Sequence, residues 1–389
     1  MMPNQHTKLE LIQAQVTFIP DGWKLDKVGN TLAIRNNFRK PISQEVRSTM
    51  QGKYPYYGPT KIQDYIAGYE QDGIYALIGE DGDHFLKYST MRQTQFISGK
   101  CTVNNHAHIL ESSDECDSEW FYTFFMHRNI TNFLSRQGAG RFKLNKATLE
   151  KLPLLVPPLP EQRKIANILR TWNKAISTTE RLIDNSKQQK KALMQQLLTS
   201  KKRLLDDSGK PFEGEWEVLT LAEMAKIKKG KALSSKHLEP GDFPVIAGGK
   251  SSPYKHSKYT HENIITISAS GAYAGFVAYH KHKIWASDCS VVEAKENTIT
   301  QFIFQFLLLN QIKIYSLQSG GAQPHIYPKD IEVLKISVPN LVEQQKIAAV
   351  LTNADKEIEL LAQQLVDLKQ EKKALMQQLL TGKRRVKCK

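Results

Sequence analysis

The chain contains one ten-residue segment twice. The sequence KKALMQQLLT occupies residues 190–199 and again residues 372–381, an offset of 182 residues. The match extends upstream without a gap, because residues 156–166 read VPPLPEQRKIA and residues 338–348 read VPNLVEQQKIA. This period is far too long for a solenoid of short repeats. It indicates that a whole domain and its connector have been duplicated.

A longer stretch that matches poorly precedes each repeated segment. These variable stretches cover about residues 17–152 and 212–334, and each has a tryptophan near its start, Trp23 in the first and Trp216 in the second. The order is therefore variable, repeated, variable, repeated. We expect a first variable domain with an N-terminal extension at 1–152, a helical spacer at 153–203, a linker with the second variable domain at 204–334, and a second helical spacer with a basic tail at 335–389.

Each repeated segment carries the heptad pattern of a coiled coil. In the second copy, apolar residues recur at alternating steps of four and three residues, with Lys372 as the polar exception. The first copy carries a weaker pattern in the same register. We expect two helices of about 40 residues, about 60 Å long at ~1.5 Å per residue. The predicted helix–helix contact residues are Ile165, Leu169, Trp172, Ile176, Ile183, Leu193, Leu197, Ile347, Leu351, Ile358, Leu361, Leu365, Leu368, Leu375 and Leu379.

Neighbouring residues define the ends of the two helices and their pairing. Pro157 and Pro339 precede the helices, Glu161 and Glu343 lie in their first turns, and Gly382 follows the second helix. Only a short linker separates the first helix from the second variable domain, which favours antiparallel pairing. We therefore expect an α+β fold in which two mixed α/β domains are separated by a long antiparallel two-helix coiled coil, duplicated about a pseudo-two-fold axis.

Lys190 and Lys372 occupy the same heptad position in the two helices. The simpler interpretation is that their charged ends extend to solvent along the apolar seam. The alternative is that a polar seam position sets the register of the helices or meets another subunit. The sequence leaves both interpretations open.

The chain carries a large positive charge. It contains 54 Lys and Arg residues against 39 Asp and Glu residues, a formal net charge of +15, which favours nucleic acid as a partner. The four cysteines form no C-x-x-C pair, so we expect a reduced, cytoplasmic protein without a zinc ribbon. We expect neither a signal peptide nor a membrane span, because no suitable apolar run is present.

The motifs that suggest catalysis are incomplete. The segment GGKS at residues 248–251 lacks the glycine spacing of a phosphate loop. Asp288, Glu293 and Lys295 follow the loose pattern of a nuclease metal site, but Lys100 stands at the position that matches Asp288 in the first copy. The N-P-P-[YF] motif of amino-methyltransferases is absent. We therefore expect neither a catalytic site nor a metal site.

The variable domains have the composition of DNA-reading domains. Short β-type runs are broken by glycine and aspartate turns, as at residues 54–61 (YPYYGPTK), 73–82 (GIYALIGEDG), 243–250 (FPVIAGGK) and 264–273 (IITISASGAY). The loops carry small polar residues, aromatic residues and lysines, which suit contact with phosphates and base edges. For any single residue, an ordinary turn between strands is the simpler interpretation.

A glycine-rich turn lies near the end of each variable domain. GAGRFK at residues 138–143 aligns with GGAQPH at residues 320–325, so the glycine is kept while the hydrogen-bond donors change. Two readers of different DNA sequences would differ in this way. The predicted DNA-contacting residues of both domains are Tyr56, Tyr57, Gly58, Lys61, Arg92, Gln93, Gly138, Arg141, Lys143, Gly249, Lys250, Ser251, Tyr254, Ser268, Ser270, Tyr273, Gly320, Gln323 and His325.

Over essentially its whole length, the chain resembles the specificity (S) subunits of type I restriction-modification systems. The resemblance rests on the repeated segments PPLPEQRKIA and PNLVEQQKIA, on YPYYG, DGIYALIGEDG and GGAQPHI, and on the alternation of variable and repeated segments. It implies two target-recognition domains, at about 17–152 and 212–334, which each read one half of a split DNA site. It also implies that this chain has no catalytic centre of its own.

The resemblance further implies partners and cofactors. The spacer helices would dock two methyltransferase (M) subunits, and two restriction or motor (R) subunits would complete a complex that acts on double-stranded DNA in phage defence. S-adenosylmethionine, ATP and Mg²⁺ would be bound by those partners, and flipping of the target adenine would be their chemistry. Two other interpretations stay open: a stand-alone nuclease that uses Asp288, Glu293 and Lys295, and a coiled-coil scaffold with two protein-binding domains.

Overall fold

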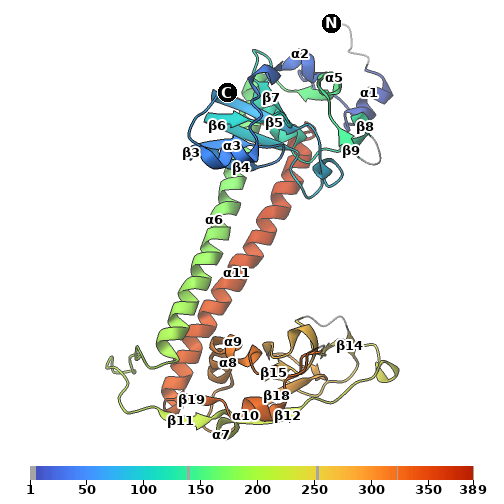
Figure 1. Ribbon diagram of the computed structural model, residues 1–389. Helices are drawn as coiled ribbons and strands as arrows, with labels where there is room; N and C mark the ends of the chain where they lie inside the picture. Colours follow the sequence, from blue (N-terminus) through green and yellow to red (C-terminus); the bar gives the residue numbers. More distant parts are fainter. Residues whose placement is uncertain (1–5, 138–140, 251–253, 322, 389) are drawn as a thin grey trace. The chain divides into compact units, whose positions relative to one another are not determined.

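The chain forms two compact units (Figure 1). Unit 1 consists of residues Met1–Ser177 and Val366–Lys389, and unit 2 of Thr178–Leu365. Each unit contains one variable domain and a part of both repeated segments, so the units divide the chain differently from the domain boundaries expected above. The structure, a computed structural model, describes all residues except 1–5, 138–140, 251–253, 322 and 389.

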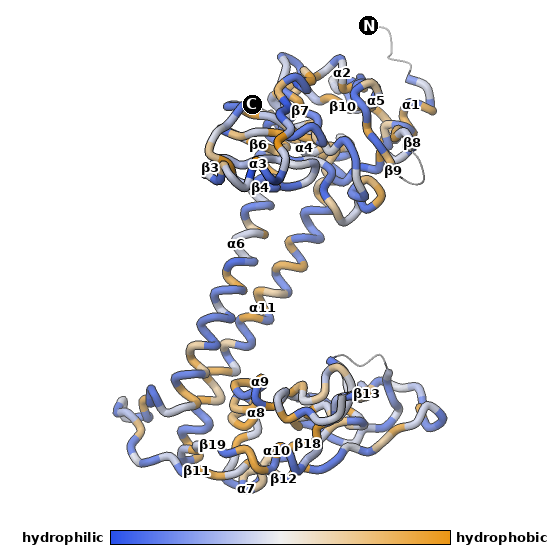
Figure 2. Tube along the Cα trace, in the orientation of Figure 1, coloured by the Kyte–Doolittle hydropathy of each residue, from blue (hydrophilic) through white to orange (hydrophobic). Residues whose placement is uncertain are grey.

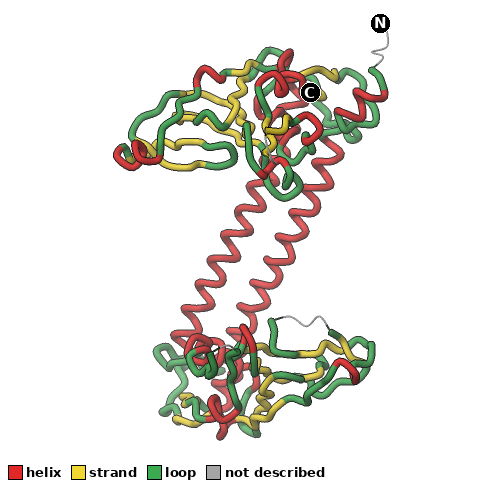
Figure 3. Tube along the Cα trace, turned by 45° about the vertical axis from the view of Figure 1, so that its right-hand side comes forward, coloured by secondary structure: helices red, strands yellow, loops and turns green. Residues whose placement is uncertain are grey.

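The two repeated segments form helices of equal length. Helix α6 (Leu159–Leu197) begins in unit 1 and ends in unit 2, helix α11 (Leu341–Leu379) begins in unit 2 and ends in unit 1, and each has 39 residues. Every predicted contact position is buried or half-buried, whereas most positions between them are exposed. Figure 2 shows apolar residues recurring along both helices, and Figure 3 shows each helix unbroken. The predicted helices are therefore confirmed, and the predicted contact positions are their less exposed residues.

Within each unit the two helices run in opposite directions. In unit 1, Ile165 near the start of α6 and Leu379 at the end of α11 belong to one apolar cluster. In unit 2, Leu197 at the end of α6 and Ile347 near the start of α11 belong to another. The beginning of one helix therefore packs near the end of the other in both units, which confirms the predicted antiparallel pairing.

The variable domain of unit 1 is built on a six-stranded sheet. Its elements are α1 (Lys8–Gln13), β1 (Lys24–Lys27), α2 (Val28–Thr31), β2 (Ala33–Ile34), η1 (Asn36–Phe38), α3 (Gln44–Thr49), β3 (Gln51–Tyr57), β4 (Ile62–Ile66), β5 (Gln71–Gly79), η2 (Asp83–Phe85), β6 (Thr94–Val103), β7 (Ala107–Glu111), α4 (Ser118–Phe125), η3 (Thr131–Phe133), β8 (Ser135–Gln137), β9 (Arg141–Lys143), α5 (Lys146–Lys151) and β10 (Pro153–Val156). The strand order is β2-β7-β5-β6-β3-β4, and only β3 and β6 pair in parallel. Strand β5 is buried along its apolar end, as a central strand must be.

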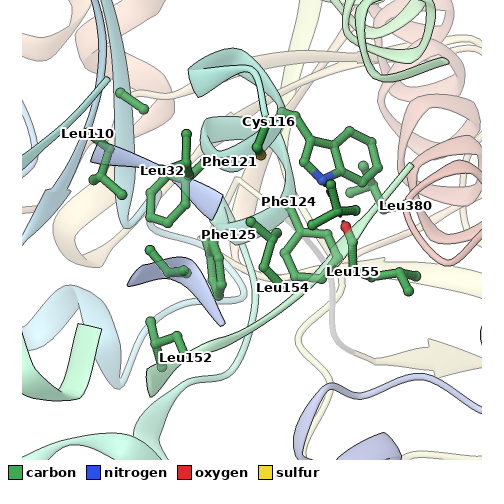
Figure 4. Packing of buried hydrophobic residues seen from close by; sticks show 14 of the residues in the cluster. Leu32, Leu110, Cys116, Phe121, Phe124, Phe125, Leu152, Leu154, Leu155 and Leu380 are labelled. Carbon is green, nitrogen blue, oxygen red and sulfur yellow. Dashed lines mark hydrogen bonds between the residues drawn. The ribbon is translucent and has the colours of Figure 1, made fainter. Parts of the chain in front are cut away.

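Helix α4 supplies the aromatic centre of the unit 1 core. Phe121, Phe124 and Phe125 cluster with leucines of β10 and with Leu380 beyond α11 (Figure 4). Trp120 Nε1 donates a hydrogen bond to the carbonyl of Leu155 in β10 at 2.9 Å, so the buried indole is satisfied. The core of unit 1 therefore includes residues from the variable domain and from both repeated segments.

The variable domain of unit 2 has a four-stranded and a three-stranded sheet. Its elements are β11 (Glu217–Thr220), α7 (Leu221–Met224), β12 (Ala225–Lys229), η4 (Ser235–His237), β13 (Phe243–Ile246), β14 (Lys255–His256), β15 (Ile264–Ser268), η5 (Gly271–Tyr273), β16 (Val277–His280), β17 (Trp285–Ala286), β18 (Cys289–Ala294), α8 (Thr300–Leu309), α9 (Gln311–Tyr315), α10 (Pro328–Glu332) and β19 (Lys335–Val338). The strand orders are β12-β18-β15-β16 and β14-β13-β17. Helix α8 packs on the four-stranded sheet, and both join the cluster that contains Leu197 and Ile347.

An arginine–glutamate ion pair joins the repeated segments in each unit. In unit 1, Arg385 beyond α11 contacts the carboxylate of Glu161, in the first turn of α6, through Nε and Nη2, each at 2.8 Å. In unit 2, Arg203 beyond α6 contacts Glu343, in the first turn of α11, through the same two atoms, each at 2.7 Å. We call these pairs the clasps. They occupy matching positions of the duplication, so the tail after one helix is held by the start of the other.

The clasps pair two buried carboxylates with guanidinium groups. Glu161 also accepts a hydrogen bond from Trp23 Nε1 at 2.9 Å, and the Arg385 guanidinium lies 5.5 Å from the centre of the Trp23 ring. Burial alone would raise the pKa of Glu161, but the hydrogen bonds from Arg385 and Trp23 outweigh burial and lower the pKa. This clasp therefore contributes stability above the ordinary carboxyl pKa, and that stability is lost as the pH falls through the lowered value.

Lys190 does not extend to solvent. It is buried, and its Nζ contacts Asp355 Oδ1 at 2.6 Å. An ion pair at a seam position specifies which residues of the two helices face each other. The structure therefore favours the interpretation that Lys190 sets the helix register.

Candidate nucleic-acid interface

Two loops of unit 2 pack against each other. The first follows β15 and the second is the glycine-rich turn at residues 320–325. Gly271 N in the first loop donates a hydrogen bond to Pro324 O in the second at 3.0 Å, and Ser270 and His325 form an isolated β-bridge. These loops carry five of the predicted DNA-contacting residues, Ser270, Tyr273, Gly320, Gln323 and His325.

The loop after β13 adds a lysine to the same surface. Lys250 Nζ lies 5.2 Å from the centre of the Tyr273 ring. Gly248 has a φ of +69°, and a Cβ there would lie 3.2 Å from Asp288 Oδ2, so this turn needs a glycine. Asp288 in turn accepts a hydrogen bond from Ser270. Three segments far apart in the sequence thus form one surface, which we call the unit 2 loop surface.

An aromatic stack with two lysines extends this surface. The rings of His325 and Tyr327 are stacked, with centres 6.2 Å apart and an interplanar angle of 16°. The Nζ atoms of Lys229 and Lys329 lie 5.7 and 5.8 Å from the centre of the Tyr327 ring. Exposed rings and ammonium groups are suited to base stacking and phosphate contact. The sequence prediction missed Tyr327 and both lysines, although the basic run AKIKKGK at residues 225–231 is a signal for Lys229.

A small cavity of about 30 Å³ lies beside Lys250. Gly249, Ser268 and His280 line it, and the volume suits about one water molecule. Burial lowers the pKa of His280 to about 4, so its ring is neutral near pH 7. Its Nε2 lies 2.8 Å from Thr266 Oγ1. A neutral imidazole can donate or accept a hydrogen bond, which suits a position next to a bound base or water.

Loops of unit 1 are brought together in a comparable way. Asn104 N donates a hydrogen bond to Tyr57 O at 3.0 Å, Glu80 N donates to His106 O at 2.8 Å, and Leu144 N donates to Glu80 O at 2.8 Å. The segments that follow β3, β5, β6 and β9 are therefore neighbours. They carry four of the predicted DNA-contacting residues at or next to these contacts, Tyr57, Gly58, Lys61 and Lys143.

A half-buried carboxylate holds two cations of this loop cluster. Glu80 contacts Arg39 Nη1 at 2.7 Å and Lys143 Nζ at 3.0 Å. Burial would raise the pKa of Glu80, but the hydrogen bonds from Lys143 and Arg39 outweigh burial and lower the pKa. Lys143 thus has an internal partner that positions β9, and its contact with DNA stays a prediction.

Some of the predicted residues lie inside the domains. The side chain of Tyr56 is buried, and its hydroxyl accepts a hydrogen bond from a backbone amide at 2.9 Å. Gln93 is fully buried, and its Nε2 donates to the carbonyl of Phe125 at 3.2 Å. Ser268 is buried beside the small cavity. We therefore do not include Tyr56, Gln93 and Ser268 in the candidate interface.

The remaining predicted residues are not tied to the two loop clusters. Arg92 and Tyr254 are exposed, on the segment before β6 and on the segment before β14. Gly138 and Ser251 lie outside the described residues, as does the side chain of Arg141.

The nuclease pattern is not assembled into one cluster. Asp288 precedes β18 and contacts Ser270, whereas Lys295 follows β18 and its Nζ donates to Ala222 O at 2.6 Å. The six-residue strand between them spans about 20 Å. In the described part of the chain, no group of three or more His, Cys, Asp or Glu residues could hold a metal ion. Within the same residues, no helix has the length and apolar character of a membrane span.

The chain is similar to known proteins over most of its length. A family model described as the type I restriction modification DNA specificity domain matches residues 20–187 and again residues 213–370. A Haemophilus influenzae protein, provisionally named as a type I restriction enzyme specificity subunit, is 28% identical over 85% of this chain and 86% of its own length. The MjaVIII specificity subunit of Methanocaldococcus jannaschii is 24% identical over 95% of this chain and 94% of its own length.

Solved structures show the same fold. The crystal structure of a type I restriction-modification S subunit from M. genitalium matches with a TM-score of 0.70 and 18% identity, covering 93% of this chain and 96% of that chain. A chain from a structural study of assembly and conformational transition in the type I system matches with a TM-score of 0.53 and 16% identity, covering 94% of this chain and 99% of that chain.

Proposed function

The chain belongs to the family of type I restriction-modification DNA specificity proteins, and we propose on this basis that it reads a bipartite DNA site, with one half read by each unit. Specificity subunits are the non-catalytic recognition components of these systems. One observation carries the proposal. Each unit contains a clasp at the matching position of the duplication and one variable domain, and the loop surfaces of the two variable domains differ in sequence. Two copies of the same helical segment that carry domains with different loops suit the recognition of two different half-sites.

Three lysines provide the electrostatic basis for DNA binding at the unit 2 loop surface. Lys229, Lys250 and Lys329 lie beside the aromatic rings of this surface, in a chain of net charge +15. Ammonium groups that contact phosphates release counter-ions, so affinity should fall steeply with salt. We expect a complex of this chain and its methyltransferase subunits to shift, in a gel, a DNA fragment that carries the motif methylated in the host genome. The fraction of shifted DNA should fall at each higher salt concentration. A shift that does not change with salt would contradict the proposal.

Replacement of Lys250 with glutamine is expected to weaken DNA binding by about tenfold, because one charge-assisted phosphate contact is lost. The slope of log affinity against log salt should fall by about one. Gel shifts at several salt concentrations measure both effects. The control is Lys151→Gln, which removes the same charge from the exposed end of α5 in unit 1. Equal effects of the two variants would mean that Lys250 acts only through net charge.

The length of the helices bears on the proposed recognition. Each has 39 residues, about 60 Å at ~1.5 Å per residue. That length corresponds to about 17 base pairs at ~3.4 Å each. We infer that the helix pair, rather than the DNA, sets the gap between the two half-sites.

The same helices are the proposed docking elements for the partners. We propose that two methyltransferase subunits bind them and that two restriction subunits complete the complex on double-stranded DNA. S-adenosylmethionine, ATP and Mg²⁺ would then be bound by those partners. Methyl transfer and cleavage would be their reactions, while this chain selects the DNA sequence at which they act.

A further inference from the structure

The two seam lysines have different surroundings although the duplication matches them. In unit 2, Lys190 Nζ contacts Asp355 Oδ1 at 2.6 Å, and Gln305 Nε2 of α8 donates to Asp355 Oδ2 at 2.8 Å. Lys190 and Gln305 are both buried. The lysine of unit 2 therefore has a carboxylate partner within the chain, and a glutamine of the variable domain holds that carboxylate in place.

Shorter or uncharged residues stand at the matching positions of unit 1. The offset of 182 residues places Asn173 where unit 2 has Asp355, and Thr123 where unit 2 has Gln305. Lys372 keeps the lysine. These three residues line a cavity of about 300 Å³ between α4 and the two helices of unit 1. Phe96, Tyr122, Leu169 and Met376 form its apolar wall, and Glu119 and Arg170 also line it.

Lys372 has no acidic partner among the described residues. Glu119, the one acidic residue of the cavity lining, is engaged by Arg170, whose Nε lies 3.1 Å from Glu119 Oε1. Burial lowers the pKa of Lys372, and the nearby charge of Arg92 lowers it further. The cavity thus combines a half-buried ammonium group, which lacks the counter-charge present in unit 2, with a wall of aromatic, leucine and methionine side chains.

We propose that the unit 1 cavity receives a carboxylate side chain of a docked methyltransferase subunit, which pairs with Lys372 as Asp355 pairs with Lys190. A half-buried cation without a partner is unfavourable, and a carboxylate in a site shielded from water relieves that cost. The apolar wall suits the residues that flank such a carboxylate. The apolar wall disfavours a fully hydrated DNA phosphate at this place.

The two ends of the duplicated helix pair are then unequal as docking sites. Unit 1 offers an open site, whereas unit 2 fills the matching site with its own Asp355 and Gln305. This inference rests on the proposed docking of methyltransferase subunits. If the inference holds, the first of two such subunits binds more tightly than the second. The ratio of the two dissociation constants should exceed the statistical ratio for two identical sites.

Stepwise binding of the methyltransferase subunit to the full chain tests this inference. Native mass spectrometry or sedimentation gives the two dissociation constants. Lys372→Gln is expected to weaken the tighter step about tenfold to a hundredfold, because one charge-assisted contact is lost. The paired change N173D/T123Q, which copies the unit 2 residues into unit 1, should weaken the same step while the chain stays folded. The reverse change, D355N/Q305T in unit 2, should tighten the weaker step.

Several outcomes would overturn the inference. Unchanged dissociation constants in N173D/T123Q and K372Q would do so, provided that hydrogen exchange shows both variants folded. Weaker DNA binding by K372Q with unchanged subunit binding would mean that Lys372 contacts a phosphate instead. If the unaltered chain binds no methyltransferase subunit at all, the proposed function fails, which distinguishes that failure from the failure of this inference.

Discussion

Replacing Arg203 with alanine is expected to lower the free energy of unfolding of unit 2 by about 3–5 kcal/mol, because a buried carboxylate would lose its partner. Glu343 is fully buried, and both of its oxygens contact Arg203 at 2.7 Å. The Arg203 guanidinium also lies 5.8 Å from the centre of the Trp216 ring, so the variant loses packing as well as charge. Hydrogen exchange of the amides in β11, β19 and α8, measured against urea concentration, reports this loss.

The clasp of unit 1 provides the matched control. Arg385→Ala should destabilise unit 1 rather than unit 2, and by a smaller amount of about 1–3 kcal/mol. The effect is smaller because the Arg385 side chain is 42% exposed and Glu161 keeps its hydrogen bond from Trp23. The double variant R203M/E343L should recover much of the loss of R203A, since no buried charge is left unpaired. If R203A loosened unit 1 as much as unit 2, the clasps would not act within single units.

Insertion of one heptad into both helices is expected to abolish recognition of the original DNA site and to create a site with a longer gap. The insertions belong after Ser177 in α6 and after Leu365 in α11, where the two units divide the chain, so the contacts within each unit are preserved. Seven residues add about 10 Å at ~1.5 Å per residue, which corresponds to at most about three base pairs. The heptad keeps the apolar seam in register.

Selection of bound fragments from DNA with randomised gap lengths measures this effect. Both half-site sequences should be unchanged, and only the gap should differ. The control is an insertion into α6 alone, which shifts one seam against the other and should reduce binding at every gap length. A changed half-site with an unchanged gap would show that the helices do not act as the spacer.

The duplicated sequence allowed the helices to be predicted in more detail than the variable domains. The heptad positions from Ile165 to Leu379 were all found buried or half-buried, because a seam depends on local spacing that the sequence displays directly. The clasps could not be predicted, since Arg385 and Glu161 are more than two hundred residues apart. The repeat shows which segments have similar sequences, but it does not show which segments are in contact. The burial of Lys190 was likewise not evident from its position alone.

The candidate interface depended on turn geometry that a sequence does not display. Ser270, Lys250 and His325 were predicted singly, and only the fold shows that they share one surface. Gln93 looked like a polar loop residue, yet its amide satisfies backbone carbonyls inside unit 1. Tyr327 was missed because a single tyrosine before a short helix has no distinctive pattern.

The central claim is that this chain alone selects a split DNA site for modification. Single-molecule sequencing of DNA from the host tests it most directly, in cells with the chain, without it, and with it restored. The account predicts N6-methyladenine within a motif of two half-sites separated by a fixed unread gap, absent after deletion and regained on restoration. An unchanged methylation pattern after deletion, or a continuous motif without a gap, would contradict it.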